Sequence, residues 1–175
     1  VFAGDWITLS FFWELMAVSS VYLIWANHTA RSRRAGFRYL LVHMFGGNLL
    51  LAGIFFKVIA GDMMVANVGA THDAAFWLMF FAVCINGVIP PHHAWVADAY
   101  PESTITGGAF MSGLTTKAAM YILIRLFAGT DFLIVVGVIM AIYGAIFAII
   151  ENDMRRLLSY HIVSQLGFMV AGVGM

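Results

Sequence analysis

The residues of this chain best suited to chemistry are two ionisable groups set inside long apolar segments. Glu14 lies within FFWELMAVSS, and Lys117 lies in the run TTKAAMYILIRL. A charged side chain at the centre of a bilayer costs about 2.5–3.5 kcal/mol on insertion scales, so such residues usually face a polar interior and mark ion paths. The alternative for Glu14 is a carboxyl that is protonated or paired for packing. We predict that Glu14 and Lys117 both take part in moving ions.

A proline pair, Pro90-Pro91, interrupts a third apolar segment and is followed directly by His92 and His93. Proline lacks a backbone donor and clashes with the preceding turn, so the pair should break any helix that contains it. Broken backbone at membrane depth is tolerated only where protein or a water-filled cavity covers it. Imidazole titrates near neutral pH. We therefore predict that at least one of the two histidines relays protons beside the break.

The remaining polar candidates admit simpler explanations. His43 and His161 lie inside expected helices, where hydrogen bonds to bundle neighbours would satisfy them. Lys57 and Arg125 lie near helix ends, from which a long side chain can reach the membrane interface. The spacings HExxH and CxxC are missing, so a metal site is unsupported. The glycine pair Gly46-Gly47 is typical of close packing between helices.

Composition places the chain in a membrane. Of its 175 residues, 62% are hydrophobic and only 10% are charged, against roughly 25% charged in an ordinary soluble domain. The nine basic and nine acidic residues cancel, which argues against nucleic acid as a partner. The single cysteine, Cys84, excludes an internal disulfide. We expect residues 1–175 to form one membrane domain that belongs to a longer subunit.

Six apolar segments would hold these groups in place, since about 20 residues cross a hydrocarbon core of about 30 Å. They run over about residues 6–26, 37–60, 74–90 with HHAWVADAY as a continuation, 104–127, 131–150, and from 153 onward. The fold class predicted is therefore all-α: a polytopic membrane helix bundle of about six crossings, with one broken helix at Pro90-Pro91.

Basic residues predict which way the bundle faces. Arginines gather between Arg31 and Arg38 and again at Arg155-Arg156, four crossings apart, so both clusters fall on one side. The connections at residues 61–73 and 128–131 fall on the other side and contain neither lysine nor arginine. Because basic loops stay in the cytoplasm, we expect both arginine clusters to be cytoplasmic.

Three stretches of the sequence, in order, resemble a known family. The run IPPHHAWVADAYPESTITGGAFMSGLTTKAAMYILIRL resembles the central motif of the proton-translocating antiporter-like subunits of respiratory complex I and of Mrp-type multisubunit Na+/H+ antiporters. FFWELMAVSSVYLIW is similar to their fifth transmembrane helix, and ENDMRRLLSYHIVSQLGFM to the start of their tenth. The run AYPESTITGGAFMSGLTTK resembles the D-type antiporter subunits most.

The resemblance implies that the chain is helices five to ten of a fold of about fourteen helices, built from two inverted halves that each contain a broken helix. By position, Glu14 matches the family's key glutamate, His93 the histidine after the proline, and Lys117 the lysine of the next helix. Asn86 stands where the family has a lysine, five residues before Pro91. The usual partner of the glutamate is therefore absent, so this half uses another carrier or its proton translocation is altered.

On this basis we expect an ion-translocating subunit with no covalent chemistry and no cofactor of its own. Glu14 would be a charge-sensing switch, Lys117 the central proton carrier, and His93 (with His92) the link toward the next half. The partners implied are other membrane subunits, protons and a candidate exchanged Na+, in the inner membrane of a bacterium or archaeon. Such a subunit serves either a secondary antiporter or an NADH:quinone oxidoreductase-type translocase, and the sequence leaves both open.

Two alternatives remain at this point. In a cytochrome-like bundle, His43 and His161 would ligate a haem from facing helices. That interpretation leaves Glu14, Lys117 and the proline break unexplained. The other alternative is a scaffold protein that keeps the fold but does not conduct.

Overall fold

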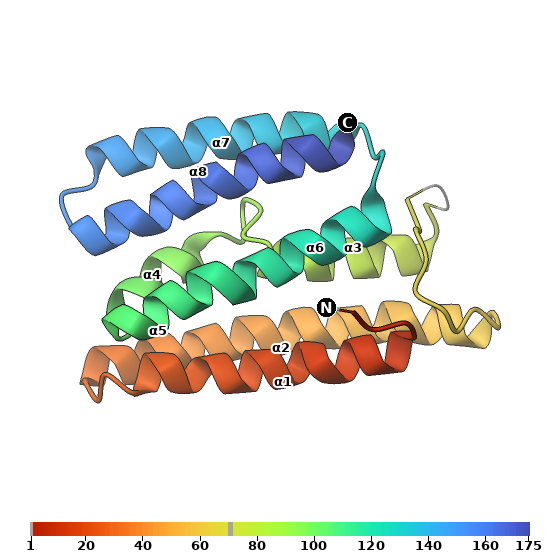
Figure 1. The fold of residues 1–175 in the computed structure, drawn as a ribbon, viewed down its shortest axis with the longest axis horizontal. Helices are drawn as coiled ribbons and strands as arrows, with labels where there is room; N and C mark the ends of the chain where they lie inside the picture. The colour runs from red at the N-terminus through yellow and green to blue at the C-terminus, as the bar shows by residue number, and fades with distance from the viewer. Residues whose placement is uncertain (1, 70–71) are drawn as a thin grey trace.

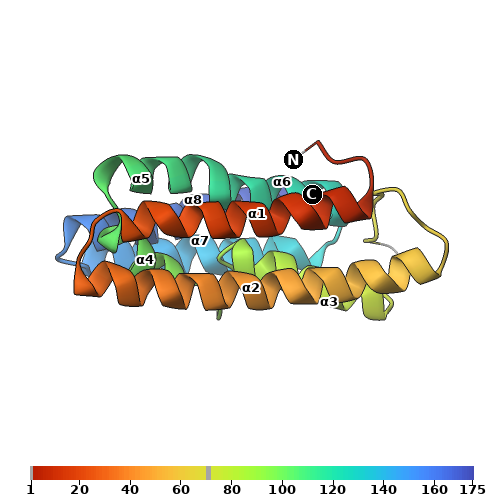
Figure 2. The same cartoon turned by 90° about the horizontal axis from the view of Figure 1, so that it is seen from below.

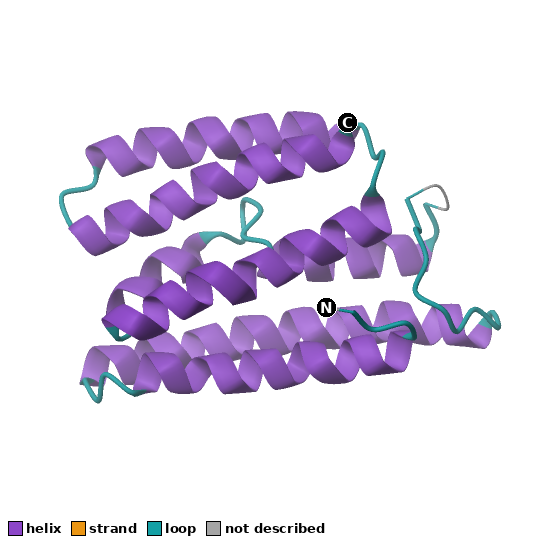
Figure 3. Ribbon diagram, in the orientation of Figure 1, coloured by secondary structure: helices purple, strands orange, loops and turns teal. Residues whose placement is uncertain are grey.

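The computed structural model describes residues 2–69 and 72–175, and nearly all of this chain is helical (Figure 3). In chain order the elements are α1 (Trp6–Trp25), α2 (Ala30–Ile59), α3 (Ala74–Asn86), α4 (Ala94–Glu102), α5 (Ile105–Phe110), the π-helical turn η1 (Met111–Thr115), α6 (Thr116–Phe127), α7 (Phe132–Ile150) and α8 (Met154–Gly174). The predicted all-α membrane bundle is confirmed. Val1, and Ala70 and Thr71 of the predicted polar loop, lie outside the described residues.

Four of the described helices, α1, α2, α7 and α8, are each long and apolar enough to cross a membrane. The other two crossings are interrupted. The first is α3 followed by α4, with the predicted break between Asn86 and Ala94. The second runs from α5 through η1 into α6, and this π-helical interruption was not predicted from the sequence.

The start of α2 differs from the prediction. We expected a loop up to Gly36, whereas the helix begins at Ala30, so the first arginines lie on its opening turns. Thr29 caps the helix by accepting from the backbone N–H of Ser32 at 2.9 Å, and Ser32 Oγ accepts from the N–H of Thr29 at 3.1 Å. This reciprocal cap satisfies two donors that a helix otherwise leaves open.

The helices form three tiers. Helices α1 and α2 lie side by side along one face, α7 and α8 pair on the opposite face, and α3 to α6 fill the space between (Figures 1 and 2). Large apolar side chains are exposed along the outer helices, among them Phe11, Phe45, Phe55, Ile139 and Phe168. Such a surface suits lipid and would be costly in water.

Glycines bring α7 and α8 into backbone contact. A Cβ built on Gly137 would lie 2.3 Å from the backbone nitrogen of Ala171, and one on Gly167 would lie 2.5 Å from that of Ala141. The Ser164 hydroxyl also donates to the Ala141 carbonyl at 3.0 Å. Small residues that let helix backbones meet are typical of packing inside membranes.

The two arginine clusters meet at one end of the bundle. Arginines from the start of α2 and Arg156 of α8 line one cavity of about 470 Å³ together with several acids. Within it, Arg38 and Asp98 form an ion pair of 2.9 Å. The predicted placement of both clusters on the same side therefore agrees with the geometry.

Candidate proton-path site

Glu14 lies near the middle of α1, where this helix crosses a glycine of α2. The carboxyl group is half-buried, and its Oε2 atom has no hydrogen-bond partner among the described residues. A Cβ built on Gly47 would lie 1.7 Å from Glu14 Oε1, so the carboxyl occupies the space that a side chain at position 47 would need. Gly47 thus gives Glu14 its place in the bundle.

Asn86 ends α3 on the other side of the same turn of α2. It is only 1% exposed, and neither its side-chain oxygen nor its nitrogen has a partner in the described part of the chain. A Cβ on Gly46 would lie 3.0 Å from Asn86 Oδ1. The adjacent glycines Gly46 and Gly47 therefore receive an amide from α3 and a carboxyl from α1.

The break between α3 and α4 lies about midway along the length of the bundle, as the loop between them in Figure 3 shows. Its freed backbone groups are partly satisfied locally: the Ile89 N–H donates to the Cys84 carbonyl at 3.0 Å, and the indole of Trp95 donates to the Ile85 carbonyl at 2.9 Å. Such compensation is what allows non-helical backbone at membrane depth.

The two histidines after the prolines lie in different surroundings. His92 is exposed. His93 is half-buried, and its Nε2 atom lies 2.7 Å from the hydroxyl of Tyr143 on α7, while its Nδ1 atom is buried without a partner among the described residues. The broken helix is thus joined to the α7–α8 pair through His93.

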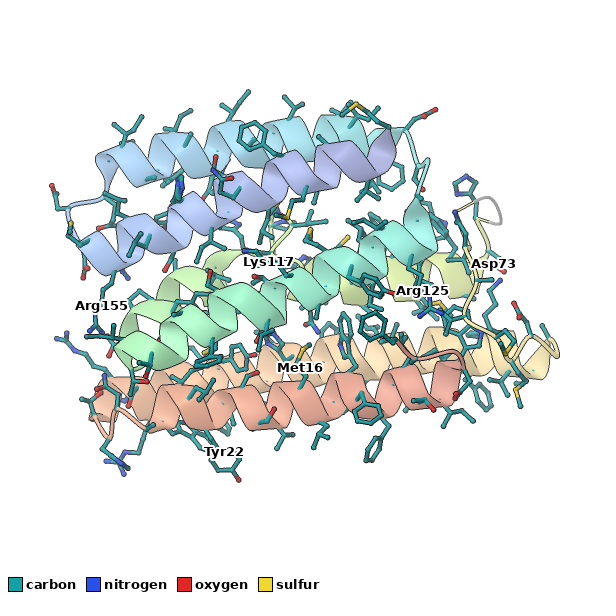
Figure 4. All side chains as sticks on the ribbon, in the orientation of Figure 1. Met16, Tyr22, Asp73, Lys117, Arg125 and Arg155 are labelled. Carbon is teal, nitrogen blue, oxygen red and sulfur yellow. The ribbon has the colours of Figure 1, made fainter. Side chains whose placement is uncertain are left out.

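Lys117 is the second residue of α6, directly after the π-helical turn, and is half-buried near the middle of the bundle (Figure 4). One turn further, the methyl group of Met120 packs against the break, since a Cβ on Gly87 would lie 2.7 Å from it. Residues three apart share a helix face. Lys117 therefore lies on the side of α6 that faces the broken helix.

The turn η1 itself touches the first helix. Thr115 Oγ1 lies 3.3 Å from the hydroxyl of Ser20 on α1, and Tyr100 of α4 donates to the Met111 carbonyl at 3.1 Å. Single π-helical turns often accompany functional positions. Here the turn places polar groups between α1 and α4 just before Lys117.

Lys57 and Arg125 each contact another segment of the chain. Lys57 is 9% exposed, and its Nζ lies 3.6 Å from Asp73, which caps α3. Arg125 donates to the backbone carbonyl of Ala3. In both cases another segment covers the helix end and supplies an acceptor, which the position along the helix could not indicate.

His43 and His161 also differ from each other. His43 is fully buried; its ring stacks on Tyr39 at 3.9 Å and meets Trp95 edge-on at 4.5 Å. Its Nδ1 atom lies 3.0 Å from the Tyr39 carbonyl of its own helix, so the expected bond to a bundle neighbour is wrong for this nitrogen. His161 is exposed on α8. A haem between these two histidines finds no support in such an arrangement.

Sequence reasoning missed Tyr143, the partner of His93. A tyrosine in an apolar helix carries no distinguishing signal by itself, because aromatic side chains are common in buried and lipid-facing positions. Tyr143 also lies one turn before Phe147, with ring centroids 4.4 Å apart, and such an aromatic pair along one helix does not indicate a functional site. Only the tertiary structure shows that its hydroxyl meets an imidazole.

Comparison with known proteins places this arrangement in a family. Residues 3–175 match the profile described as the transmembrane region of NADH:quinone oxidoreductase and Mrp antiporter proteins. The chain belongs to this family. The chain is 30% identical over 193 residues to the D subunit of the Na(+)/H(+) antiporter of Alkalihalophilus pseudofirmus. It is 29% identical over 201 residues to the M subunit of the NADH-quinone oxidoreductase of Mycobacterium tuberculosis.

The family fold is also seen in a solved structure. A protein in the structure of the Mrp complex from a Dietzia species superposes with a TM-score of 0.87 and 29% identity, covering 98% of this chain and 36% of that one. The antiporter and oxidoreductase relatives are matched over 98% and 99% of this chain but only 38% and 36% of their own lengths. The chain therefore spans little more than a third of these family members.

Proposed function

We propose that this chain forms part of a proton-translocating subunit of a multisubunit membrane complex, either an Mrp-type Na+/H+ antiporter or a complex I-like oxidoreductase. The observation that carries the proposal is Glu14, a half-buried carboxyl with one oxygen that has no partner among the described residues, held against Gly47 inside a membrane bundle of this family. A bare packing role would leave that oxygen's lost hydration uncompensated.

In this proposal three groups carry the charge. Glu14 is the switch whose ionisation responds to charge nearby, and Lys117 is the central carrier on the side of α6 that faces the break. His93, in contact with Tyr143, passes the proton toward α7 and α8. His92 is exposed and takes no part in this contact, so its role is secondary to that of His93. Moving one charge alters the proton affinity of the next, which couples the steps.

The names of the relatives suggest the partner subunits, the ions and the membrane. They are named as subunits of an Na(+)/H(+) antiporter and of NADH-quinone oxidoreductase, so the partners proposed here are other membrane subunits of one such complex, with protons as the ion carried and Na+ as the candidate counter-ion. The membrane proposed is the inner membrane of a bacterium or archaeon, with the arginine-rich end in the cytoplasm.

The test is proton flux in vesicles that contain the complete complex. Glu14→Gln keeps the size and hydrogen bonding of the side chain but removes its charge. We expect flux to fall roughly tenfold or more, as loss of a positioned proton-transfer group commonly does, while complex yield stays unchanged. Asp62→Asn, in an exposed loop, is the matched control. Full flux in the Glu14 variant would contradict the switch role.

A further inference from the structure

Two buried polar side chains, His43 and Asn86, and half-buried Glu14 lie along one stretch of α2 without forming hydrogen bonds to one another. His43 is 0% and Asn86 1% exposed, and Glu14 presents its Oε2 atom at the same level. In these three side chains, the buried atoms that have no hydrogen-bond partner among the described residues are His43 Nε2, both polar atoms of Asn86, and Glu14 Oε2. Asn86 and Glu14 border the glycine pair Gly46-Gly47, and His43 lies one turn earlier on the same helix, α2.

The positions on α2 explain why these groups are close. His43 precedes Gly46 and Gly47 by three and four residues, so all three share one face of the helix. Asn86 Oδ1 borders Gly46 and Glu14 Oε1 borders Gly47. Trp95 contacts both His43 and the end of α3. Its ring centroid lies 4.5 Å from that of the His43 imidazole, and its Nε1–H donates to the carbonyl of Ile85, the neighbour of Asn86.

Unpaired buried polar atoms destabilise a folded protein, because each has lost its hydrogen bonds to water. In folded proteins nearly all such atoms are satisfied by protein or by ordered water. A buried water needs two to four polar partners, and the amide, carboxyl and imidazole provide both donors and acceptors. The glycines leave no side chain of α2 between these groups. Water is therefore the missing partner that fits the chemistry.

The hydrogen bond of His43 determines which nitrogen can take a proton. The Tyr39 carbonyl accepts from Nδ1 at 3.0 Å, which fixes the neutral tautomer with its hydrogen on Nδ1. The lone pair of Nε2 is then the acceptor, and it is this atom that lacks a partner among the described residues. The nitrogen of His43 that can accept a proton is therefore Nε2.

The charged and titratable groups on the packed elements single out Glu14 as the donor. On α1 Glu14 is the ionisable group at this level. On α3 the neighbouring positions are neutral Asn86 and the buried thiol of Cys84. On α4, Asp98 is already paired with Arg38 at 2.9 Å, and Tyr100 donates to the Met111 carbonyl. The hydroxyl of Tyr39, on α2 itself, lies beside Ser20 and Thr115.

We propose that His43 Nε2, the Asn86 amide and Glu14 Oε2 together bind a buried water cluster, and that His43 accepts the proton that Glu14 releases. The proton leaves the Glu14 carboxyl, passes through the water and bonds to Nε2, leaving a carboxylate and an imidazolium. The net charge of the site does not change, and Asn86 orients the water without titrating. The proposal rests on the proton-translocating function above and adds a carrier that this chain places on α2.

The test compares two substitutions of His43 in the complete complex reconstituted in vesicles. His43→Phe keeps a ring to stack on Tyr39 and Trp95 but removes the proton acceptor. His43→Gln keeps hydrogen bonding to water but cannot hold a proton near neutral pH. We expect both to lower proton flux per assembled complex roughly tenfold or more. His28→Asn is the control, because His28 is exposed and asparagine tolerates its left-handed backbone (φ 53°).

Each outcome supports or contradicts the role of His43 as proton acceptor. Full flux in His43→Phe, or restoration by His43→Gln, would overturn the proton-accepting role. If His43→Phe assembles poorly, flux per assembled complex in His43→Gln still decides. Loss in Glu14→Gln with full flux in both His43 variants would reject this inference while leaving the proposed function intact. Wild-type flux in the Glu14 and His43 variants alike would reject both. High-resolution imaging of the complex should show water density beside Nε2, and a dry contact there would equally contradict the cluster.

Discussion

Asn86 stands where the resemblance implies a lysine, and its surroundings indicate what such a difference would change. Its side chain is buried beside Gly46, with no partner for either polar atom in the described part of the chain. A neutral amide cannot offset the charge of Glu14 as a lysine would. In the proposed function the charge of Glu14 is balanced by Lys117 and, in our further inference, by His43.

The first prediction follows for Lys117. Lys57 is paired with Asp73 at the far end of α2, so it cannot serve as a replacement carrier. We expect Lys117→Ala to lower proton flux through this protein roughly tenfold or more. Lys117→Arg should fail similarly, because a guanidinium stays protonated and cannot hand its proton on. Flux in reconstituted vesicles, normalised to protein yield, measures both.

A second substitution, at Asn86, tests whether another lysine can replace Lys117. Asn86→Lys puts an ammonium group into the unsatisfied cluster beside Gly46. If water fills the cluster, the lysine is tolerated and partly restores flux to Lys117→Ala. A dry site would instead destabilise the protein, because an unpaired charge would be buried. Undiminished flux in Lys117→Ala alone would rule out Lys117 as the carrier.

At the scale of helices, the sequence predicted some interruptions and missed others for clear reasons. The break after α3 follows from the covalent chemistry of Pro90-Pro91, which no packing can reverse. The π-helical turn at Met111–Thr115 has no such residue, and the Ser20–Thr115 and Tyr100–Met111 contacts that accompany it are tertiary. The early start of α2 went unseen because its arginines are hydrophilic, although Thr29 and Ser32 carried a capping signal.

The same distinction applies to the candidate site. Rare charges in apolar segments were visible without a structure, which is why Glu14 and Lys117 could be named. Contacts within the site could not be predicted in the same way, since a contact such as His93–Tyr143 joins residues 50 positions apart in the sequence. The ion pair of Lys57 was missed for the same reason, because the distance of Lys57 from a helix end says nothing of Asp73.

The pairing of α7 and α8 gives a prediction at this scale. A Cβ at position 167 would meet backbone atoms of Ala141, which cannot move aside as a side chain could. We expect Gly167→Ala to force the helices apart and to cost about 1–3 kcal/mol, the range for overpacking. Gly172→Ala is the matched control, since no described atom lies within 4 Å of its added carbon. Thermal unfolding of the purified complex compares the two, and equal midpoints would contradict the close contact.

At the scale of the whole molecule, the prediction concerns which way the bundle faces. Arg155 lies at one end of the bundle, and Asp73 and Arg125 lie toward the other (Figure 4). Cysteines introduced at Asn152, in the exposed turn between α7 and α8, and at exposed Ala66 should therefore react from opposite sides of the membrane. Asn152→Cys should react with an impermeant reagent only from the cytoplasm, provided that Cys84, which is buried, is first shown to be silent. Reaction of both from one side would overturn the six-crossing topology.

The long α2 helix also fixes an electrical property of the site. Arg38 and Lys57 are about 19 residue steps apart, or about 28 Å at 1.5 Å per residue, which is close to the thickness of the hydrocarbon layer. Gly47, against which Glu14 lies, is about halfway between them. A proton that reaches Glu14 from either side has therefore crossed about half of the membrane potential, which is worth about 1.2 kcal/mol per 100 mV. Loading and release at Glu14 would then depend on voltage to about the same degree.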